Sequence, residues 1–185
     1  MEEYLGVIRL APDYDILPFD CGDSDLNEFL VSDAKAYQER LLAVTYLVEA
    51  EDRTTLYFCL SNDKVTMLET SKGFWRKVKA LFPHSKHRKE YPAVKIGRLA
   101  VDKTFQRSDI RWGTVALDYI KRWMVDGNKT GCRFITVDAY REAVPFYVRN
   151  GFKFMGTTEK DRYETGKDHT IAMYFDLAEV IETDR

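Results

Sequence analysis

Residues 97–114 read GRLAVDKTFQRSDIRWGT, and this stretch decides the fold class. It begins inside an apolar run, 93–101, that predicts a β-strand, and continues through a polar segment, 105–113, that predicts a loop. From 115 to 124, apolar residues recur at helical spacing, which predicts an amphipathic helix. The stretch is therefore a strand–loop–helix unit, the kind of element pair from which α/β folds are built.

The segments that follow continue this alternation. Residues 134–137 predict a buried strand, and 141–150 predict a short helix that tolerates Pro145 only in its first turn. Two further strands are expected at 151–155 and 170–175. This strand–helix–strand order predicts a mixed sheet with parallel strands in the second half of the chain, flanked by helices in a single α/β domain.

The first half of the chain contributes three more strands and one helix. The strands are expected at 4–10, 42–50 and 54–60, where β-branched and aromatic residues are frequent. The helix is expected between the first two strands, with Ser24 or Asp25 as its N-cap.

The composition indicates a folded protein and limits its environment. With 45% hydrophobic residues and a net charge of −2, the chain can bury a core and lacks the overall positive charge typical of nucleic-acid binding proteins. Cys21, Cys59 and Cys132 are odd in number and widely spaced, which predicts free thiols in a reducing compartment. No Cys or His spacing matches a zinc site, so no metal is expected.

Neither a membrane span nor a secretion signal is predicted. No apolar run reaches the roughly 20 residues that a transmembrane helix needs. The first three residues are acidic rather than basic, unlike a signal peptide. We therefore expect a cytoplasmic protein that does not associate with membranes.

Residues 72–92 form a basic insert between the third and fourth predicted strands. Its first part has an apolar helical face, and its remaining surface is positively charged through Lys72, Arg76, Lys77 and Lys79. One interpretation is a solvated amphipathic helix and loop. The other is an RNA-contacting surface, in which these side chains neutralise phosphates in a salt-dependent manner.

Two motifs in the second half resemble the GNAT acetyltransferases. Residues 97–106 resemble the fourth strand and the start of the coenzyme A loop of that family, and 146–152, FYVRNGF, resemble its F-Y-x-x-x-G-F signature. The resemblance covers 93–176 well. Residues 19–30 resemble more weakly the branch that contains toxins acetylating aminoacyl-tRNA, together with stand-alone homologues.

The pyrophosphate loop departs from the family pattern Q/R-x-x-G-x-G/A. Counted without gaps, Asp109 and Arg111 replace its two glycines. Counted with two extra residues, Gly113 becomes the last glycine and the following helix stays in phase, which is the alignment we prefer. A carboxylate at Asp109 is unfavourable beside a pyrophosphate unless it points away, whereas a helix N-terminus near Arg107 and Arg111 favours an anion.

The resemblance implies that acetyl-coenzyme A binds between the strand near Leu99 and the strand near Val137. The strand would contact the pantetheine arm and supply an N–H to the tetrahedral oxyanion, and the loop N–H groups would meet the phosphates. The implied binding residues are Leu99, Ala100, Val101, Gln106, Arg107, Ser108, Arg111, Trp112, Gly113 and Thr114.

Tyr147 matches the family's catalytic tyrosine, which donates a proton to the departing thiolate. A tyrosine hydroxyl has a pKa of about 10 and is therefore protonated at neutral pH. No matched residue is a compelling general base for the amine. If the acceptor is an α-amine with a pKa near about 8, a dedicated base matters less.

Three classes of function follow from these observations. The first is N-acetyl transfer from acetyl-coenzyme A to an amine, either a small or peptidic amine or the amino group of a charged tRNA. The second is a non-catalytic binding module, which the substituted loop at Asp109 and Arg111 keeps open. The third is an RNA-binding regulatory partner acting through 72–89. The oligomeric state is open, and a dimer is compatible with the sequence.

Overall fold

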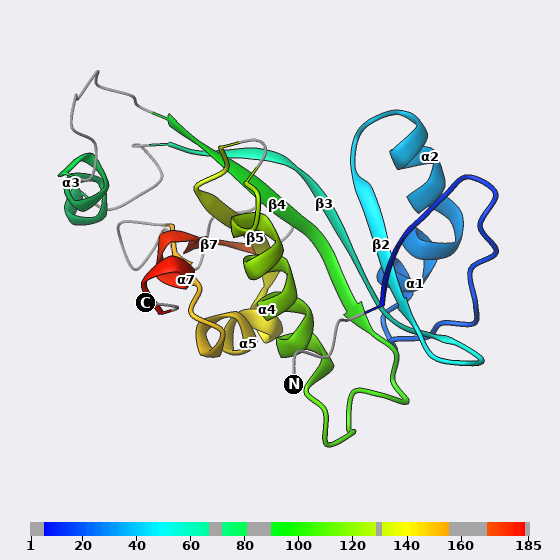
Figure 1. Ribbon diagram of the computed structural model, residues 1–185. Helices are drawn as coiled ribbons and strands as arrows, with labels where there is room; N and C mark the ends of the chain where they lie inside the picture. Colours follow the sequence, from blue (N-terminus) through cyan, green and yellow to red (C-terminus); the bar gives the residue numbers. More distant parts are fainter. Residues whose placement is uncertain (1–5, 67–71, 81–89, 129–130, 156–169, 184–185) are drawn as a thin grey trace. The chain divides into compact units, whose positions relative to one another are not determined.

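The computed structural model describes residues 6–66, 72–80, 90–128, 131–155 and 170–183 (Figure 1). Seven strands form one mixed sheet in the order β1-β2-β3-β4-β5-β7-β6, which confirms the predicted α/β fold with a helix-flanked mixed sheet. The pairs β1–β2, β2–β3, β5–β7 and β6–β7 are antiparallel.

The elements have the following bounds. The strands are β1 (Val7–Arg9), β2 (Val44–Glu49), β3 (Thr54–Thr66), β4 (Glu90–Val101), β5 (Phe134–Tyr140), β6 (Lys153–Phe154) and β7 (Thr170–Asp176). The helical elements are α1 (Ser24–Glu28), η1 (Phe29–Asp33), α2 (Ala34–Glu39), α3 (Lys72–Ala80), α4 (Trp112–Val125), η2 (Arg141–Ala143), α5 (Val144–Arg149) and α7 (Ala178–Thr183).

The chain divides into two compact units. The first comprises Met1–Ser61 and Ile96–Ile120, and the second comprises Asn62–Lys95 and Lys121–Arg185.

In the first unit, both faces of β2 and β3 are covered. On one face, Leu47 and Tyr57 pack with Phe29 from the helical segment that follows α1. On the other face, Tyr46 stacks on Phe58, and Phe58 contacts Tyr119 of α4 at a ring distance of 6.5 Å. Because side chains on both faces are buried, the first part of β3 reads as a continuous apolar run rather than an alternating one.

The helical segment 24–39 begins and continues differently from the prediction. Its N-cap is Asp23, whose carboxylate accepts the backbone N–H of Leu26 at 3.1 Å, so the prediction of Ser24 or Asp25 is wrong. Asp23 is the residue with the extended backbone that an N-cap requires. The helix then widens into the π-helical turn η1 before α2 continues it.

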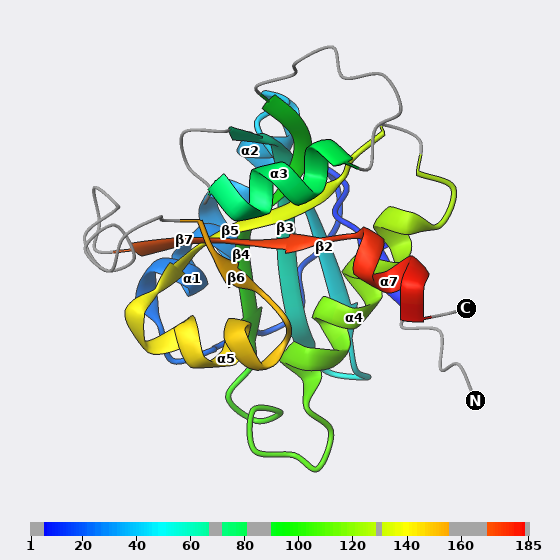
Figure 2. The same cartoon turned by 90° about the vertical axis from the view of Figure 1, so that its left-hand side faces the viewer.

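In the second unit, β7 lies between β5 and β6, and α5 leads into β6 (Figure 2). Tyr91, Phe134 and Tyr174 form the centre of one apolar cluster, which Trp75 of α3 completes. Trp75 is buried and packs on Tyr91 with ring centroids 5.0 Å apart. Among the side chains of α3 that the structure describes, Trp75 attaches the helix to this cluster, in the segment where the sequence predicts a helical insert. The basic stretch 84–89 lies outside the described residues.

Three elements, β3, β5 and α4, are longer than the segments predicted from the pattern of apolar residues in the sequence. Strand β3 runs past Leu60 to Thr66 although its second half is polar, and β5 continues to Tyr140. Asp63 on β3 accepts a hydrogen bond from Thr136 on β5, which offsets the cost of placing a carboxylate in a strand. Helix α4 begins at Trp112 rather than at 115, because apolar periodicity reports only the packed turns.

Candidate active site

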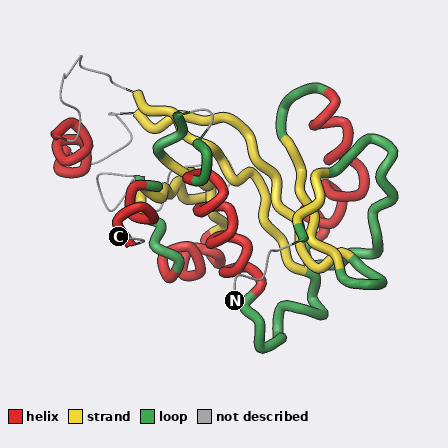
Figure 3. The backbone as a smooth tube through the Cα atoms, viewed as in Figure 1, coloured by secondary structure: helices red, strands yellow, loops and turns green. Residues whose placement is uncertain are grey.

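A loop joins β4 to α4 (Figure 3). Asp102 anchors the start of this loop. Its carboxylate is fully buried and accepts the backbone N–H of Asp20 at 2.9 Å and that of Thr104 at 2.8 Å. The guanidinium of Arg53 lies 3.4 Å away. Burial acts to raise the pKa of Asp102, but these donors outweigh it and hold the pKa below its usual value.

Two polar side chains inside the loop hold its shape. The Gln106 amide donates hydrogen bonds to the carbonyl oxygens of Cys21 and Val101, both at 2.8 Å. The Ser108 hydroxyl lies 2.8 Å from the Phe105 carbonyl oxygen and 2.9 Å from that of Ile110. Both residues are predicted to bind coenzyme. That role stays a prediction, and the structure adds a positioning role for each.

The charged side chains of the loop point outward. Arg107, Asp109 and Arg111 are all exposed. In the part of the chain that the structure describes, Asp109 forms an ion pair with neither arginine. Both guanidinium groups therefore keep their positive charge available to an anion.

The first turn of α4 presents unused backbone donors. The Trp112 N–H bonds to the Ile110 carbonyl at 3.0 Å, and the Val115 N–H bonds to that of Arg111 at 3.0 Å. Between them, the N–H groups of Gly113 and Thr114 donate to no residue that the structure describes. Such donors at the positive end of a 14-residue helix favour an anionic group.

Strand β4 carries the other predicted coenzyme residues. Ala100 is buried in the apolar cluster around Phe29, whereas Leu99 and Val101 are half-buried. Trp112, at the far end of the loop, packs edge-on against Phe105 with ring centroids 6.2 Å apart. Trp112 thus has a packing role within the protein, and its contact with coenzyme stays a prediction.

Tyr147 lies in α5, within the second unit. Its side chain is only 6% exposed and sits between the rings of Phe146 and Phe152, at 5.1 and 5.3 Å. The hydroxyl has no hydrogen-bond partner among the described residues. Burial raises the pKa of Tyr147 above the usual tyrosine value.

A left-handed turn ends α5 and fixes the residues that surround Tyr147. The Gly151 N–H bonds to the Val148 carbonyl at 3.0 Å, and the Phe152 N–H bonds to the Tyr147 carbonyl at 3.0 Å. With Gly151 at φ +82°, this is a Schellman motif, the left-handed stop that the Asn150-Gly151 pair predicts.

A buried lysine supports this turn. The Lys121 ammonium donates to the Asn150 carbonyl oxygen at 2.8 Å and lies 4.4 Å from the centroid of the Phe175 ring. A cation at the C-terminal end of α5 is favoured by the helix dipole. Sequence reasoning missed both Asp102 and Lys121 as site-positioning residues, because neither pattern nor spacing shows that a charged side chain is buried.

We expect Gly151→Ala to destabilise the protein by about 2 kcal/mol, measured by chemical denaturation. The left-handed backbone penalises any side chain by roughly 1 kcal/mol, and the new Cβ would lie 3.0 Å from Phe175. Gly127→Ala is the matched control, because Gly127 has φ +65° and open space around it. Equal losses for the two variants would mean that the Phe175 contact adds nothing.

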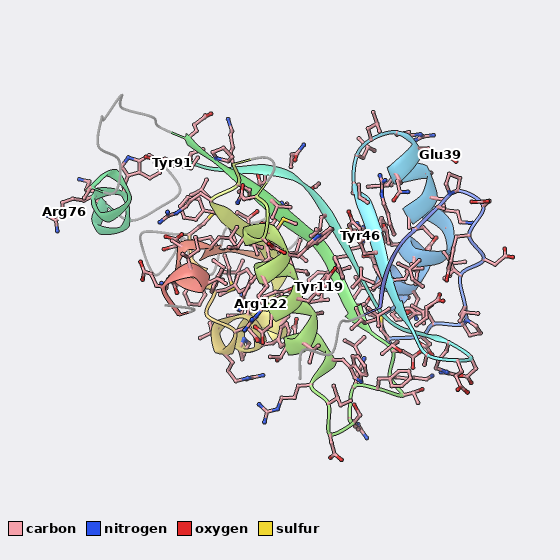
Figure 4. The ribbon with its side chains drawn as sticks, in the orientation of Figure 1. Glu39, Tyr46, Arg76, Tyr91, Tyr119 and Arg122 are labelled. Carbon is pink, nitrogen blue, oxygen red and sulfur yellow. The ribbon has the colours of Figure 1, made fainter. Side chains whose placement is uncertain are left out.

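The described residues of α3 include two of the four predicted RNA-contacting side chains. Lys72 and Arg76 are exposed, and Arg76 projects from the side of α3 opposite Tyr91 (Figure 4). The side chains of Lys77 and Lys79 lie outside the described set. The buried Trp75 thus leaves a charged face of α3 available to solvent.

Three further properties concern membrane spans, metal-binding groups and the cysteines. Among the described residues, no helix is both long and apolar enough to cross a bilayer. The same residues contain no group of three His, Cys, Asp or Glu side chains arranged to hold a metal ion. Cys21, Cys59 and Cys132 are free thiols, as predicted.

No protein-family model matches the chain, but its fold is similar to solved structures of acetyltransferase toxins. A Tyr-to-Phe variant of KacT matches with a TM-score of 0.75 at 24% identity, covering 96% of this chain and 97% of that one. AtaT complexed with acetyl-methionyl-tRNAfMet matches with a TM-score of 0.74 at 22% identity, covering 97% and 98%.

A third structure shares the same fold. It is a Tyr-to-Phe variant of AtaT bound to the C-terminus of the antitoxin AtaR and acetyl-CoA, with a TM-score of 0.64 at 20% identity over 96% of each chain. These similarities extend over nearly the full length of every chain compared. The chain therefore has the GNAT fold that its two sequence motifs predict.

Proposed function

We propose that this protein is an N-acetyltransferase that moves an acetyl group from acetyl-coenzyme A to the amino group of an aminoacyl-tRNA. One observation carries the transferase assignment. The unused N–H groups of Gly113 and Thr114 open α4 beside the exposed Arg107 and Arg111, at the end of a loop pinned by Gln106. This combination of helix N-terminus and guanidinium groups suits the coenzyme pyrophosphate.

Asp109 does not conflict with this assignment. It is exposed and unpaired in the described part of the chain, so its carboxylate can remain in water while the backbone N–H groups face the phosphates. The alignment with two extra loop residues agrees with this arrangement, because Gly113 lies in the first turn of α4.

Tyr147 is the residue we propose as general acid. The amine nitrogen attacks the thioester carbon, the carbon–sulfur bond breaks, and the Tyr147 hydroxyl gives its proton to the leaving thiolate. Solvent takes the proton released by the amine and later reprotonates the tyrosinate. The Tyr147 ring is buried, and its hydroxyl forms no hydrogen bond with any described residue. The hydroxyl proton is therefore available for transfer to the thiolate.

Similarity to the toxin structures supports a charged tRNA as acceptor. One of those structures contains acetyl-methionyl-tRNA and another contains acetyl-CoA, and two carry a Tyr-to-Phe substitution. On this chain, the exposed basic face of α3 is consistent with an RNA partner. Small and peptidic amines are the competing acceptors.

The test is acetyl transfer from radiolabelled acetyl-coenzyme A to total charged tRNA, to deacylated tRNA and to a panel of small amines. We expect label only in charged tRNA, released by mild base together with the amino acid. Calorimetric titration with acetyl-coenzyme A runs beside it. Absence of coenzyme binding at millimolar concentration would instead support the non-catalytic binding module.

The RNA contact predicts a specific salt dependence. Replacing both Lys72 and Arg76 by Ala is expected to weaken tRNA binding and to reduce the slope of log affinity against log salt by about 1.4 to 1.8, since each lost phosphate contact contributes about 0.7 to 0.9. Fluorescence anisotropy at several salt concentrations measures this. Lys35→Ala with Arg40→Ala is the charge-matched control on α2, and an equal change in both double variants would remove α3 from the interface.

A further inference from the structure

Asp20, just before α1, is hydrogen-bonded to the loop that joins β4 to α4, and both segments belong to the first unit. Its backbone N–H donates to the Asp102 carboxylate at 2.9 Å, and its carbonyl oxygen accepts the Lys103 N–H at 2.8 Å. Its Oδ2 atom accepts the Lys103 ammonium. Asp20 therefore holds the loop at its first residues through both its backbone and its side chain.

The other carboxylate oxygen of Asp20 shapes the turn that precedes α1. The Oδ1 atom accepts the Gly22 N–H and the side-chain amide of Asn27, both at 2.9 Å. The Asn27 Oδ1 atom in turn accepts the Cys21 N–H at 2.9 Å. These bonds orient the Cys21 carbonyl oxygen, which accepts the Gln106 amide at 2.8 Å. The turn thus contacts the loop at its start and again at Gln106.

Hydrogen bonds, rather than burial, fix the loop in this region. Residues 106–111 are all exposed, so apolar packing does little to hold their backbone. Directly after Gln106 come the guanidinium groups and backbone donors that we propose to meet the coenzyme pyrophosphate. A loop that becomes ordered only on binding loses conformational entropy at that step, whereas a loop ordered beforehand binds its ligand more tightly.

The acceptor role of the Asp20 carboxylate is expected to matter more than its charge. Lys103, Asn27 and the Gly22 N–H lower the pKa of Asp20 to about 2, so the group is ionised at neutral pH. The ion pair with Lys103 is exposed to solvent, and exposed pairs contribute little. The bonds that Oδ1 accepts within the turn carry no such screening of two opposite charges, and an amide oxygen can also accept them.

We propose that Asp20 is a positioning residue for the coenzyme, which holds the β4–α4 loop in the shape that receives the pyrophosphate. Asp20 acts through the loop and touches neither the coenzyme nor the acceptor. This inference rests on the proposed function. It also gives a role to residues 19–30, which the acetyl-transfer step itself does not use.

The experiment compares two acetyl donors that differ in the pyrophosphate and its attached nucleotide. Acetyl-coenzyme A carries both, and S-acetylpantetheine has the same thioester and pantetheine arm without any phosphate. Calorimetry measures Kd for the first donor, and ligand-detected NMR measures Kd for the second. The proteins are the wild type, Asp20→Ala, Asp20→Asn and a control variant.

The matched control is Asp23→Ala, which removes a carboxylate from the same turn. Asp23 is exposed, and its carboxylate accepts the Leu26 N–H at 3.1 Å as the N-cap of α1. Among the described residues, that carboxylate accepts no hydrogen bond from the loop. The control therefore weakens the start of α1 without removing a contact to the coenzyme loop.

We expect Asp20→Ala to raise the Kd of acetyl-coenzyme A by about tenfold, the effect of one or two lost hydrogen bonds. The Kd of S-acetylpantetheine is expected to stay within about twofold, because this donor has no phosphate for the loop to hold. Asp20→Asn keeps an acceptor for Gly22 and Asn27 and loses only the exposed ion pair, so it should remain within about threefold of the wild type. Asp23→Ala should leave both values within about twofold.

Equal weakening of both donors in Asp20→Ala, or no weakening of either, would overturn the positioning role. A rise in the Kd of acetyl-coenzyme A for Asp23→Ala as large as that for Asp20→Ala would also overturn it, in favour of a general effect of α1 stability. If Asp20→Ala does not fold, Asn27→Ala removes the amide that joins Asp20 to Cys21 and provides the same comparison. Failure of the folded wild type to bind acetyl-coenzyme A would instead refute the proposed function.

Discussion

Tyr147→Phe is expected to lower kcat for acetyl transfer by a factor of about 10² to 10⁴, while the affinity for acetyl-coenzyme A stays within about twofold. The substitution removes only the hydroxyl, and that group has no partner among the described residues. The packing of the ring against Phe146 and Phe152 is retained, so the fold has no reason to change. Single-turnover kinetics and calorimetric titration measure the two quantities.

Tyr37→Phe is the control for loss of a tyrosine hydroxyl. Tyr37 lies on α2, is 37% exposed, and contacts Phe29 through its ring. We expect its variant to retain wild-type kcat. A Tyr147→Phe enzyme with near-wild-type kcat would exclude the hydroxyl as the acid and assign protonation of the thiolate to solvent.

The pH dependence of kcat provides an independent check on Tyr147. A general acid must be protonated, and burial raises the pKa of this hydroxyl above the usual value of about 10. The group therefore remains a competent acid throughout the range in which an exposed tyrosine would ionise. We therefore expect ionisation of Tyr147 to cause no decrease in the wild-type kcat between pH 8 and pH 10. Any decrease in this range should also occur in Tyr147→Phe.

Asp102→Ala is expected to reduce the free energy of unfolding by about 3 kcal/mol at pH 7 and to abolish measurable coenzyme binding. The buried carboxylate satisfies the N–H groups of Asp20 and Thr104, and its removal leaves these two donors without their acceptor and Arg53 without its ion-pair partner. The loop that leads to α4 then loses its anchor. Urea denaturation and calorimetric titration test the two effects.

Acid weakens this contribution in the wild type. The pKa of Asp102 is lower in the folded state than the value of about 3.9 in an unfolded chain, so its stabilisation is fully present above that value. It is lost as the pH falls through the lower, folded pKa. The stability difference between wild type and Asp102→Ala should accordingly shrink between pH 5 and pH 2.

Asp109→Ala is the matched control in the same loop. Asp109 is exposed and forms no ion pair with the described residues, so its removal is expected to change stability by less than about 0.5 kcal/mol. An Asp102→Ala protein as stable as Asp109→Ala would show that the buried carboxylate is not an anchor.

The elements with strong local patterns were predictable from sequence. The amphipathic face predicted for α4 includes Ala116 and Ile120, which are both fully buried, and Gly151 ends α5 with the left-handed backbone that its position predicts. These features depend on side chains close together in the chain, so periodicity and turn chemistry report them directly.

The ends of several elements were not predictable in this way. The start of α4 at Trp112 and the N-cap at Asp23 depend on which backbone groups find partners. The polar half of β3 is a strand although its side chains argue against one, and its Asp63 finds its partner on β5. Local propensity contains no information on partners more than 70 positions away.

The sequence by itself determined the α/β class, the GNAT resemblance and the candidacy of Tyr147, because short motifs in the right order express all three. Only the tertiary structure decided that Asp102 is buried and hydrogen-bonded, that Tyr147 is enclosed by aromatic rings, and that Arg98 stacks on Phe29. The physical reason is common to the three. The state of a polar side chain depends on its solvation and its partners, and both are set by residues brought near it from distant parts of the chain.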